Sequence, residues 1–323
     1  PMPVGDAGGR TPPLELVAVG IEVARAARAP IALTLNAAGG QNHDALRPPL
    51  AATISALGDA AGGIASWHGR FAGAAGLGAM LAPDGVAEFD ARTARPPYAA
   101  AAVRIEAASV PLPIACGYVR GDVAPLASFA NESFVDELAR ARGIEPLAFR
   151  IGLLGGQPRL ARVLEQAATR GGWDGGARGS TLGLACAAGF GSVIGLLADA
   201  GIGSDQRIEV RRLVAAVDAG RLVNPGLVRQ QIEGGLLHAL VSATGAAPEI
   251  IAGMPRARAL GALGVPTLKG LPKIEVVLVA SNAAAGGVSG LGALVLAAAV
   301  GNAIFAATGM RLRRLPFDPM SAA

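Results

Sequence analysis

One long run without any charged side chain, Val276–Met310, constrains the fold of this chain more than any other feature. Such a run has to be buried, either in a lipid bilayer or in a protein core. Its interior carries serines, asparagines and a glycine cluster at 286–292, which is a poor composition for a membrane span. The run therefore predicts a strand over 274–280, then a glycine loop, then a buried helix over 291–308, with no membrane span.

Composition excludes several classes of protein. Of the 323 residues, 52% are hydrophobic and 16% are charged, which excludes a disordered chain. Two cysteines are too few for a disulfide scaffold. A net charge of +4 is too small to indicate a nucleic-acid partner at this length. The mean hydropathy of +0.45 is high, and it predicts a large apolar interface with another chain.

Secondary-structure signals alternate without a regular βαβ rhythm, so an α+β fold is expected. A helix is expected after Thr11-Pro12-Pro13, and another is expected to start at Ser128 as its cap and to end at Gly143. Further helices are predicted over 159–170 and 225–244. Strands are predicted over 30–35, 53–72 (interrupted by Gly62-Gly63), 101–107, 182–188, 193–199 and 208–217.

The chain is poor in residues for common mechanisms. Its histidines, His43, His68 and His238, are far apart and have no partner at metal-binding spacing. Cys116 and Cys186 lack the spacing of zinc or redox motifs, so both are expected to be structural thiols. No metal site is predicted. The chain begins without the pattern of a signal peptide, and its compartment stays open between bacterial cytoplasm and periplasm.

Two glycine loops remain as candidate binding elements. Gly5-Asp6-Ala7-Gly8-Gly9-Arg10 and the segment 286–292 each precede an expected helix. Backbone N–H groups in such turns can face an anion. The alternative is a tight turn that only allows close backbone packing, and spacing by itself favours this alternative.

From Gly117 onward, the order of several motifs resembles one family, the molybdopterin-binding large subunits of xanthine dehydrogenases and aldehyde oxidoreductases. The nearest likeness is to the beta subunit of isoquinoline 1-oxidoreductase. The motifs that carry the resemblance, in chain order, are YVRG at 118–121, NESFVDELA at 131–139, GIEPLAFR at 143–150, AVDAGR at 216–221, VNP at 223–225, QIEGG at 231–235, NAIFAATG at 302–309 and RRLP at 313–316.

The resemblance implies how the chain is organised and what it binds. Family subunits are about twice as long, so this chain looks like a C-terminal half. Residues 1–116 resemble the middle of the family subunit, and residues 117–323 resemble its C-terminal molybdopterin-binding domain. The implied partners are a complementary N-terminal half or a homologous large subunit, together with an iron–sulfur subunit, in an obligate hetero-oligomer.

The family's catalytic base is missing from the aligned position. Family enzymes hydroxylate carbon with a molybdenum-bound oxygen, and a glutamate in a G-V-G-E-x-G loop accepts the proton. Here Gly290 occupies the place of that glutamate. Losing a general base costs about 10²–10⁴-fold in rate.

Several other positions match family residues that contact molybdopterin. By the resemblance these are Gln231, Gly191, Ser192, Gly287, Val288, Ser289, Gly8 and Gly9, with Arg120 beside the substrate pocket. Asp6 adds a negative charge where an anionic pterin is expected. By itself, Gln231 could equally satisfy backbone groups near the start of a helix.

Two hypotheses from different classes follow. In the first, the chain shares molybdopterin with a partner and takes part in oxidising an aldehyde or an N-heterocycle. In the second, it is a degenerate homologue that stabilises a larger oxidoreductase complex without catalysis. Gly290 favours the second hypothesis, and the retained Gln231 favours the first only weakly.

Overall fold

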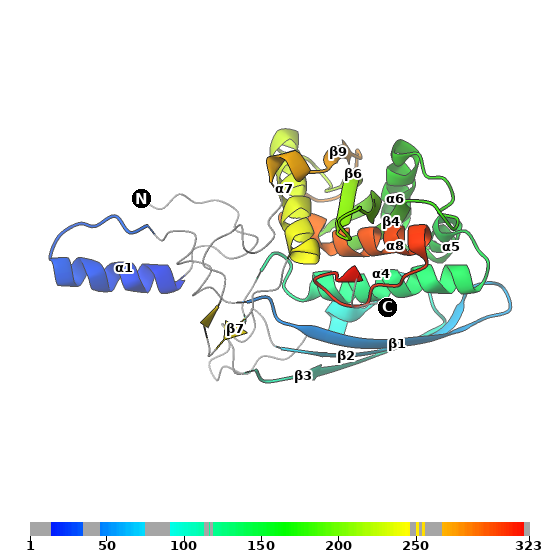
Figure 1. Ribbon diagram of the computed structural model, residues 1–323, viewed down its shortest axis with the longest axis horizontal. Coiled ribbons are helices and arrows are strands. Elements are labelled where there is room, and N and C mark those ends of the chain that lie inside the picture. The colour runs from blue at the N-terminus through cyan, green and yellow to red at the C-terminus, as the bar shows by residue number, and fades with distance from the viewer. Residues whose placement is uncertain are drawn as a thin grey trace.

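The computed structural model describes residues 14–34, 46–74, 91–112, 116, 119–245, 250–251, 254–255 and 267–319. These residues form an α+β fold with two main sheets, as the sequence predicts. Figure 1 shows helix α4 lying between the two sheets.

A four-stranded mixed sheet forms the centre of the larger part. Its order is β4 (Leu182–Gly189), β5 (Ser192–Ile202), β6 (Ile208–Asp218) and β9 (Lys273–Leu278). The first three strands are antiparallel, and β9 is parallel to β6. Side chains alternate between two buried faces, so both sides of this sheet need a covering layer.

Helices cover the two faces at very short distance. On one face lie α8 (Leu296–Thr308) and α7 (Pro225–Thr244), and on the other lies α6 (Pro158–Gly171). Gly183 on β4 faces the backbone of α8, and a Cβ atom there would overlap Ala299 and Ala303. Gly195 on β5 faces α6 in the same way, with Leu164 Cα at 2.7 Å from such a Cβ. At these two glycines the sheet therefore packs directly against the helix backbones.

The second sheet has three strands and lies beyond α4 (Ala124–Ala141). Its strands are β1 (Leu50–Gly58), β2 (Ile64–Gly73) and β3 (Ala102–Ser109), with β1 antiparallel and β3 parallel to β2. The Trp67 ring on β2 packs edge-on against Phe134 of α4, with centroids 5.2 Å apart. This aromatic contact joins the sheet to the main core.

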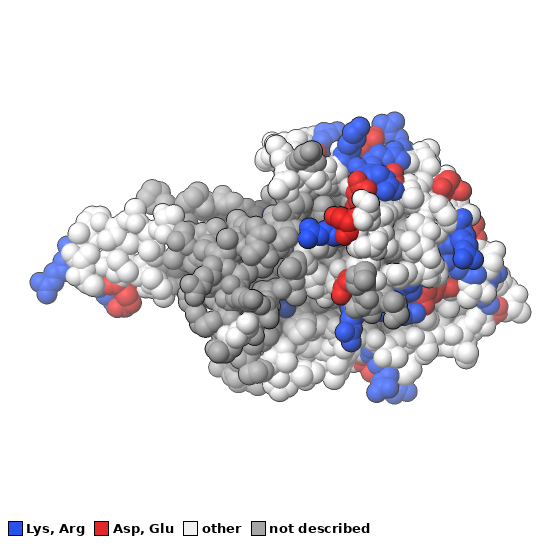
Figure 2. All heavy atoms as spheres, in the orientation of Figure 1, with Lys and Arg blue, Asp and Glu red and all other residues white. Residues whose placement is uncertain are grey.

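The remaining described elements are short or peripheral. They are α1 (Leu14–Ala27), η1 (Ala91–Ala94), α5 (Pro146–Leu153), β7 (Ile250–Ile251), β8 (Met254–Pro255), η3 (Leu268–Gly270) and η4 (Leu291–Leu294). Figure 1 shows α1 standing away from the sheets. Over the part of the molecule that contains the two sheets, Lys and Arg side chains are interspersed with Asp and Glu side chains on the face seen in Figure 2.

Most of the predicted elements are confirmed, with three differences. The segment predicted as a strand at 30–35 is irregular over its described residues 30–34. Ser128 is not a cap, because α4 already begins at Ala124, where Pro125 supplies the preset φ of a first turn. Helix α5 was not predicted; Glu145 caps it by accepting from the N–H groups of Leu147 and Ala148.

The helical part of the charge-free run is buried as predicted, whereas the loop before it, 280–289, is half-buried or exposed. The run forms the end of β9, this loop, the short η4 turn and α8. Among the described residues, the segment Leu291–Thr308 is long and apolar enough to cross a membrane by length and composition, but 83% of it is buried inside the protein. Its place between the four-stranded sheet and α4 and α7 is that of a core helix.

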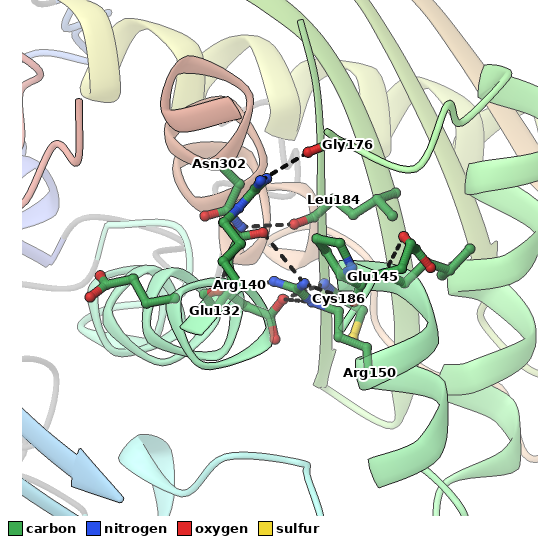
Figure 3. A network of polar contacts seen from close by, with 12 residues as sticks. Glu132, Arg140, Glu145, Arg150, Gly176, Leu184, Cys186 and Asn302 are labelled. Atoms are coloured by element: carbon green, nitrogen blue, oxygen red, sulfur yellow. Dashed lines mark hydrogen bonds and ion pairs between the residues drawn. The ribbon is translucent and has the colours of Figure 1, made fainter. Parts of the chain in front are cut away.

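A buried ionic network ties α4, α5 and β4 together (Figure 3). Glu132 accepts hydrogen bonds from the Tyr98 hydroxyl at 2.6 Å, from Arg150 Nε at 3.2 Å and from the Cys186 amide at 3.2 Å. Arg150 also donates to the carbonyls of Glu132 and Pro146. Burial raises the pKa of Glu132, and the neighbouring Arg150 opposes that shift.

Candidate functional site

A loop and a turn from different parts of the chain pack together at one end of the four-stranded sheet. The turn between β4 and β5 contains Phe190 (φ 58°) and Gly191 (φ 79°), both in the left-handed region. The loop after β9 is joined to it by a hydrogen bond of 2.8 Å from the Gly287 amide to the Phe190 carbonyl. A second bond, from the Gly286 amide to Ala219, fixes the loop to the end of β6.

Ser192 is the buried polar residue of this junction. It is only 1% exposed, and its Oγ has no hydrogen-bond partner in the described part of the chain. A Cβ atom at Gly286 would collide with this hydroxyl, so the loop can approach Ser192 this closely only because residue 286 is glycine. An unpaired buried hydroxyl costs roughly 1–3 kcal/mol, which marks the position as one that a ligand group could complete.

Helix α7 supplies the third wall. Asn224 caps it by accepting from the Leu227 amide, and Pro225 stands in its first turn. A Cβ atom on Gly235 would lie 3.6 Å from the Ser289 carbonyl, and one on Gly292 would lie 3.0 Å from the Ile232 carbonyl. These contacts bring the glycine loop onto the α7 backbone, one turn after Gln231.

Gly290 is buried within the junction and carries no group that could accept a proton. Its φ of −101° is open to any residue. A Cβ atom there would lie 3.1 Å from two ring carbons of Phe190 and 3.2 Å from the Gly121 amide. The Phe190 ring, 44% exposed, therefore lies where a longer side chain at position 290 would begin.

A cluster of basic residues borders the same loop. Arg120 Nη1 donates to the Ser289 carbonyl at 3.2 Å, and Arg47 donates to the Arg120 carbonyl at 3.4 Å. On α7, the Nε2 atom of His238 is buried and has no hydrogen-bond partner among the described residues. Burial, together with the charges of Arg120 and Arg47, lowers the pKa of His238 to about 4. The imidazole is therefore neutral at pH 7.

An ion pair supports the Phe190–Ser192 turn from behind. Arg159 at the start of α6 donates from Nε to Asp218 Oδ2 and from Nη2 to Oδ1, both at 2.8 Å. Its Nη1 reaches the Gly191 carbonyl at 3.4 Å, and Asp218 Oδ1 accepts from the Gly220 amide. Hydrogen bonding to Arg159 lowers the pKa of Asp218. The two loops are thereby held to one framework.

The structure thus brings together most of the site residues expected from the sequence. Those that meet at the junction are Gly191, Ser192, Gly287, Val288, Ser289, Gly290 and Arg120, with Gln231 half-buried on the adjoining helix. Gly8, Gly9 and Asp6 lie outside the described residues. The loop amides correct one expectation: those of Gly286 and Gly287 bond to protein carbonyls, so these two do not face a ligand.

Two residues of the junction were missed by sequence reasoning. Phe190 sits between two glycines, a pattern typical of a tight turn. His238 was expected to be a structural or surface residue, because it has no partner at metal-binding spacing, and its neighbours Arg120 and Arg47 in the fold are distant in the sequence. The described residues contain no group of three His, Cys, Asp or Glu side chains that could hold a metal ion.

Two family models match the chain, and both are described as Molybdopterin cofactor-binding domain. One covers residues 5–152 and the other covers residues 204–272. The chain is 32% identical over 211 residues to the beta chain of isoquinoline 1-oxidoreductase of Brevundimonas diminuta, covering 64% of this chain and 27% of that protein. It is 31% identical over 250 residues to one of the subunits of the nicotinate dehydrogenase of Pseudomonas putida, covering 71% of this chain and 21% of that protein.

Solved structures show the same fold at low identity. The aldehyde oxidoreductase of Desulfovibrio desulfuricans superposes with a TM-score of 0.71 and 16% identity, over 93% of this chain and 51% of that chain. Quinoline 2-oxidoreductase of Pseudomonas putida 86 superposes with a TM-score of 0.68 and 12% identity, over 84% and 61%. The chain matches only about a quarter of the length of its curated relatives. It belongs to the family of molybdopterin cofactor-binding subunits that these domain models and curated relatives represent.

Proposed function

We propose that this chain is the C-terminal, cofactor-holding part of a molybdenum hydroxylase that acts on an aldehyde or an N-heterocycle, and that it contributes no catalytic base. Residues 117–323 would form the molybdopterin-binding domain, and residues 1–116 would complete the middle of the subunit. The observation that carries the proposal is the junction of the Phe190–Ser192 turn, the 286–292 loop and α7, combined with glycine at position 290.

The donor set of the junction fits a pterin. Ser192 offers a buried hydroxyl whose hydrogen-bonding capacity is unused within the described chain, and Gln231 offers an amide donor and acceptor one turn from the loop. Gly191 leaves room, since a Cβ there would meet only Gly286 Cα at 3.5 Å. When bound, the molybdenum cofactor would supply two-electron oxidation chemistry. Ser192, Gln231 and the amides of residues 288–290 would orient it.

The chain's own residues would be poor proton acceptors at the junction. Gly290 has no side chain, and the Ser289 hydroxyl is too weak a base at neutral pH without assistance. Burial, together with the charges of Arg120 and Arg47, lowers the pKa of His238 and keeps it from accepting a proton at neutral pH. We therefore expect negligible turnover from this chain's residues, with any proton acceptor supplied by a partner chain.

Cofactor analysis of the purified complex tests the proposal. Molybdenum by mass spectrometry and released pterin by fluorescence should be present, and Gln231→Leu should reduce both about tenfold. The matched control is Gln166→Leu, which removes an exposed glutamine on α6 and should leave both unchanged. Equal cofactor content in the two variants would refute the role of Gln231 and the placement of the site.

Restoring the acid tests the missing base separately. Gly290→Glu alone has to displace the Phe190 ring, so the double variant Gly290→Glu, Phe190→Ala should gain more hydroxylase activity than the single one. Normal turnover by the unmodified chain, in a complex with no second molybdenum site, would show that no base is missing.

A second function is favoured by Gly290 itself. A degenerate homologue that stabilises a larger oxidoreductase complex would keep the core and the loop packing without a base. Such a subunit would co-purify with its complex and contain no pterin, and its removal would lower the complex's stability without changing activity per active site.

A further inference from the structure

A cavity lies apart from the junction, between α4, the segment 92–99, β4 and the start of α6. Its volume is about 490 Å³, within the range of small-molecule sites. None of the residues proposed to hold the cofactor lines it. The lining residues used below are Arg95, Pro96, Tyr98, Asn131, Glu132, Leu153 and Leu294.

The inner wall of the cavity is formed by residues of the buried hydrogen-bond network. Tyr98 and Glu132, 4% and 1% exposed, belong to the buried network with Arg150 and Cys186. Figure 3 shows Glu132 and Arg150 pointing toward each other with Cys186 beside them. Both carboxylate oxygens of Glu132 already accept hydrogen bonds from the protein. The network therefore preorganises the wall and leaves recognition to other residues.

Asn131 supplies an unused acceptor on this wall. The side chain is 4% exposed, and its Nδ2 donates to the Ala94 carbonyl at 2.9 Å. That bond fixes the amide orientation, and Oδ1 is left buried with no partner in the described part of the chain. Buried amide oxygens are normally paired, so this atom has the capacity to accept a hydrogen bond from an N–H or O–H group of a ligand.

The rim and the walls define the rest of the ligand. Arg95 is exposed at the mouth and makes no ion pair with the residues that the structure describes, so it can meet an oxyanion. Pro96, Leu153 and Leu294 add apolar surface between the mouth and the wall. We propose that this cavity binds a small organic anion, whose carboxylate or phosphate faces Arg95, whose body packs on the apolar wall, and whose amino or hydroxyl group donates to Asn131 Oδ1.

Calorimetric titration of the purified chain, in whatever complex it forms, tests this site with defined probes. 4-Aminobenzoate carries both the donor and the carboxylate, and 4-aminophenyl phosphate carries the donor and a phosphate. Benzoate lacks the donor, and 4-aminobenzamide lacks the charge. At least one aminated anion should bind with a Kd below about 1 mM, and the better of the two identifies the oxyanion. Benzoate and 4-aminobenzamide should each bind about fivefold or more weakly than 4-aminobenzoate.

Two variants locate the binding. Arg95→Gln should weaken 4-aminobenzoate about fivefold or more and leave 4-aminobenzamide unchanged. The control Arg104→Gln removes an exposed arginine on β3, away from the cavity, and should change neither affinity. Absence of saturable binding by both aminated anions overturns the proposal. So does indifference to the amino group, or equal effects of the two arginine variants. None of these outcomes bears on the cofactor content of the junction.

Discussion

Arg150→Met removes the cation from the buried network while keeping much of the side-chain volume. Arg150 is fully buried, and its guanidinium serves Glu132 and the carbonyls of Glu132 and Pro146. Removing one partner of a buried ion pair leaves the other charge uncompensated, at a cost of about 3–5 kcal/mol. An unfolding entropy of about 2.1 cal/mol/K per residue over 323 residues gives ~0.7 kcal/mol/K, so the melting temperature should fall by about 6 °C.

The matched control is Arg170→Met, which breaks a pair of the same kind at the surface. Arg170 donates to Glu275 at 2.7 Å, but the two side chains are 59% and 44% exposed. Such a pair contributes about 0–1 kcal/mol. Differential scanning fluorimetry and urea unfolding of both variants measure the contrast.

The sign of the pH dependence gives a second check. Burial raises the pKa of Glu132, and loss of Arg150 raises it further, because Arg150 is its main favourable charge. The folded variant then binds a proton that an unfolded glutamate has released. Its stability deficit should therefore shrink as the pH falls, by up to about 1.4 kcal/mol per pH unit. Equal losses in the two variants, or a deficit that grows as the pH falls, would refute the reasoning.

Three further outcomes follow from the structure. Gly183→Ala should destabilise the protein by about 1–3 kcal/mol in urea unfolding, because the added Cβ meets the α8 backbone. The control Gly152→Ala in α5 has open space around the added Cβ and should gain stability. Equal effects of the two substitutions would contradict the packing described. The pKa of His238, followed by NMR, should be about 4 and should rise in Arg120→Gln, since a neighbouring cation is removed; an ordinary value near 6.5 would count against the site geometry. The chain alone should self-associate in sedimentation, because Val19, Ile21 and Val23 of α1 are exposed, and a monodisperse monomer would argue against an obligate partner.

Periodicity predicted the core elements well, because their apolar faces are local patterns. The strands β4, β5, β6 and β9 and the helices α6 and α7 all lie where the sequence places them. Local capping rules failed at Ser128, because Pro125 three residues earlier is a stronger start signal for α4. The irregular 30–34 segment shows the limit of a short apolar run, which becomes a strand only where another strand pairs with it.

The sequence predicted the glycines of the candidate site, but it did not predict which basic residues would come together there. The loop at 286–292 was found as a glycine-rich turn before an expected helix, and the Gly191-Ser192 pair was found from its match to a family motif. The meeting of Arg47, Arg120 and His238 depends on three segments far apart in the chain, so no sequence window contains it. The unpaired Ser192 hydroxyl likewise appears only when burial is known.

Gly183 and Gly195, where the sheet packs directly on the backbones of α8 and α6, allow the scaffold to be retained independently of the active-site chemistry. At Gly183 and Gly195, main chain rests on main chain, so the spacing of these layers depends little on side chains elsewhere. A lineage could exchange the acid of its active site for glycine without moving the β4–β5 turn or the loop after β9. Retention of the fold in such a chain is therefore weak evidence that the ancestral reaction has been retained.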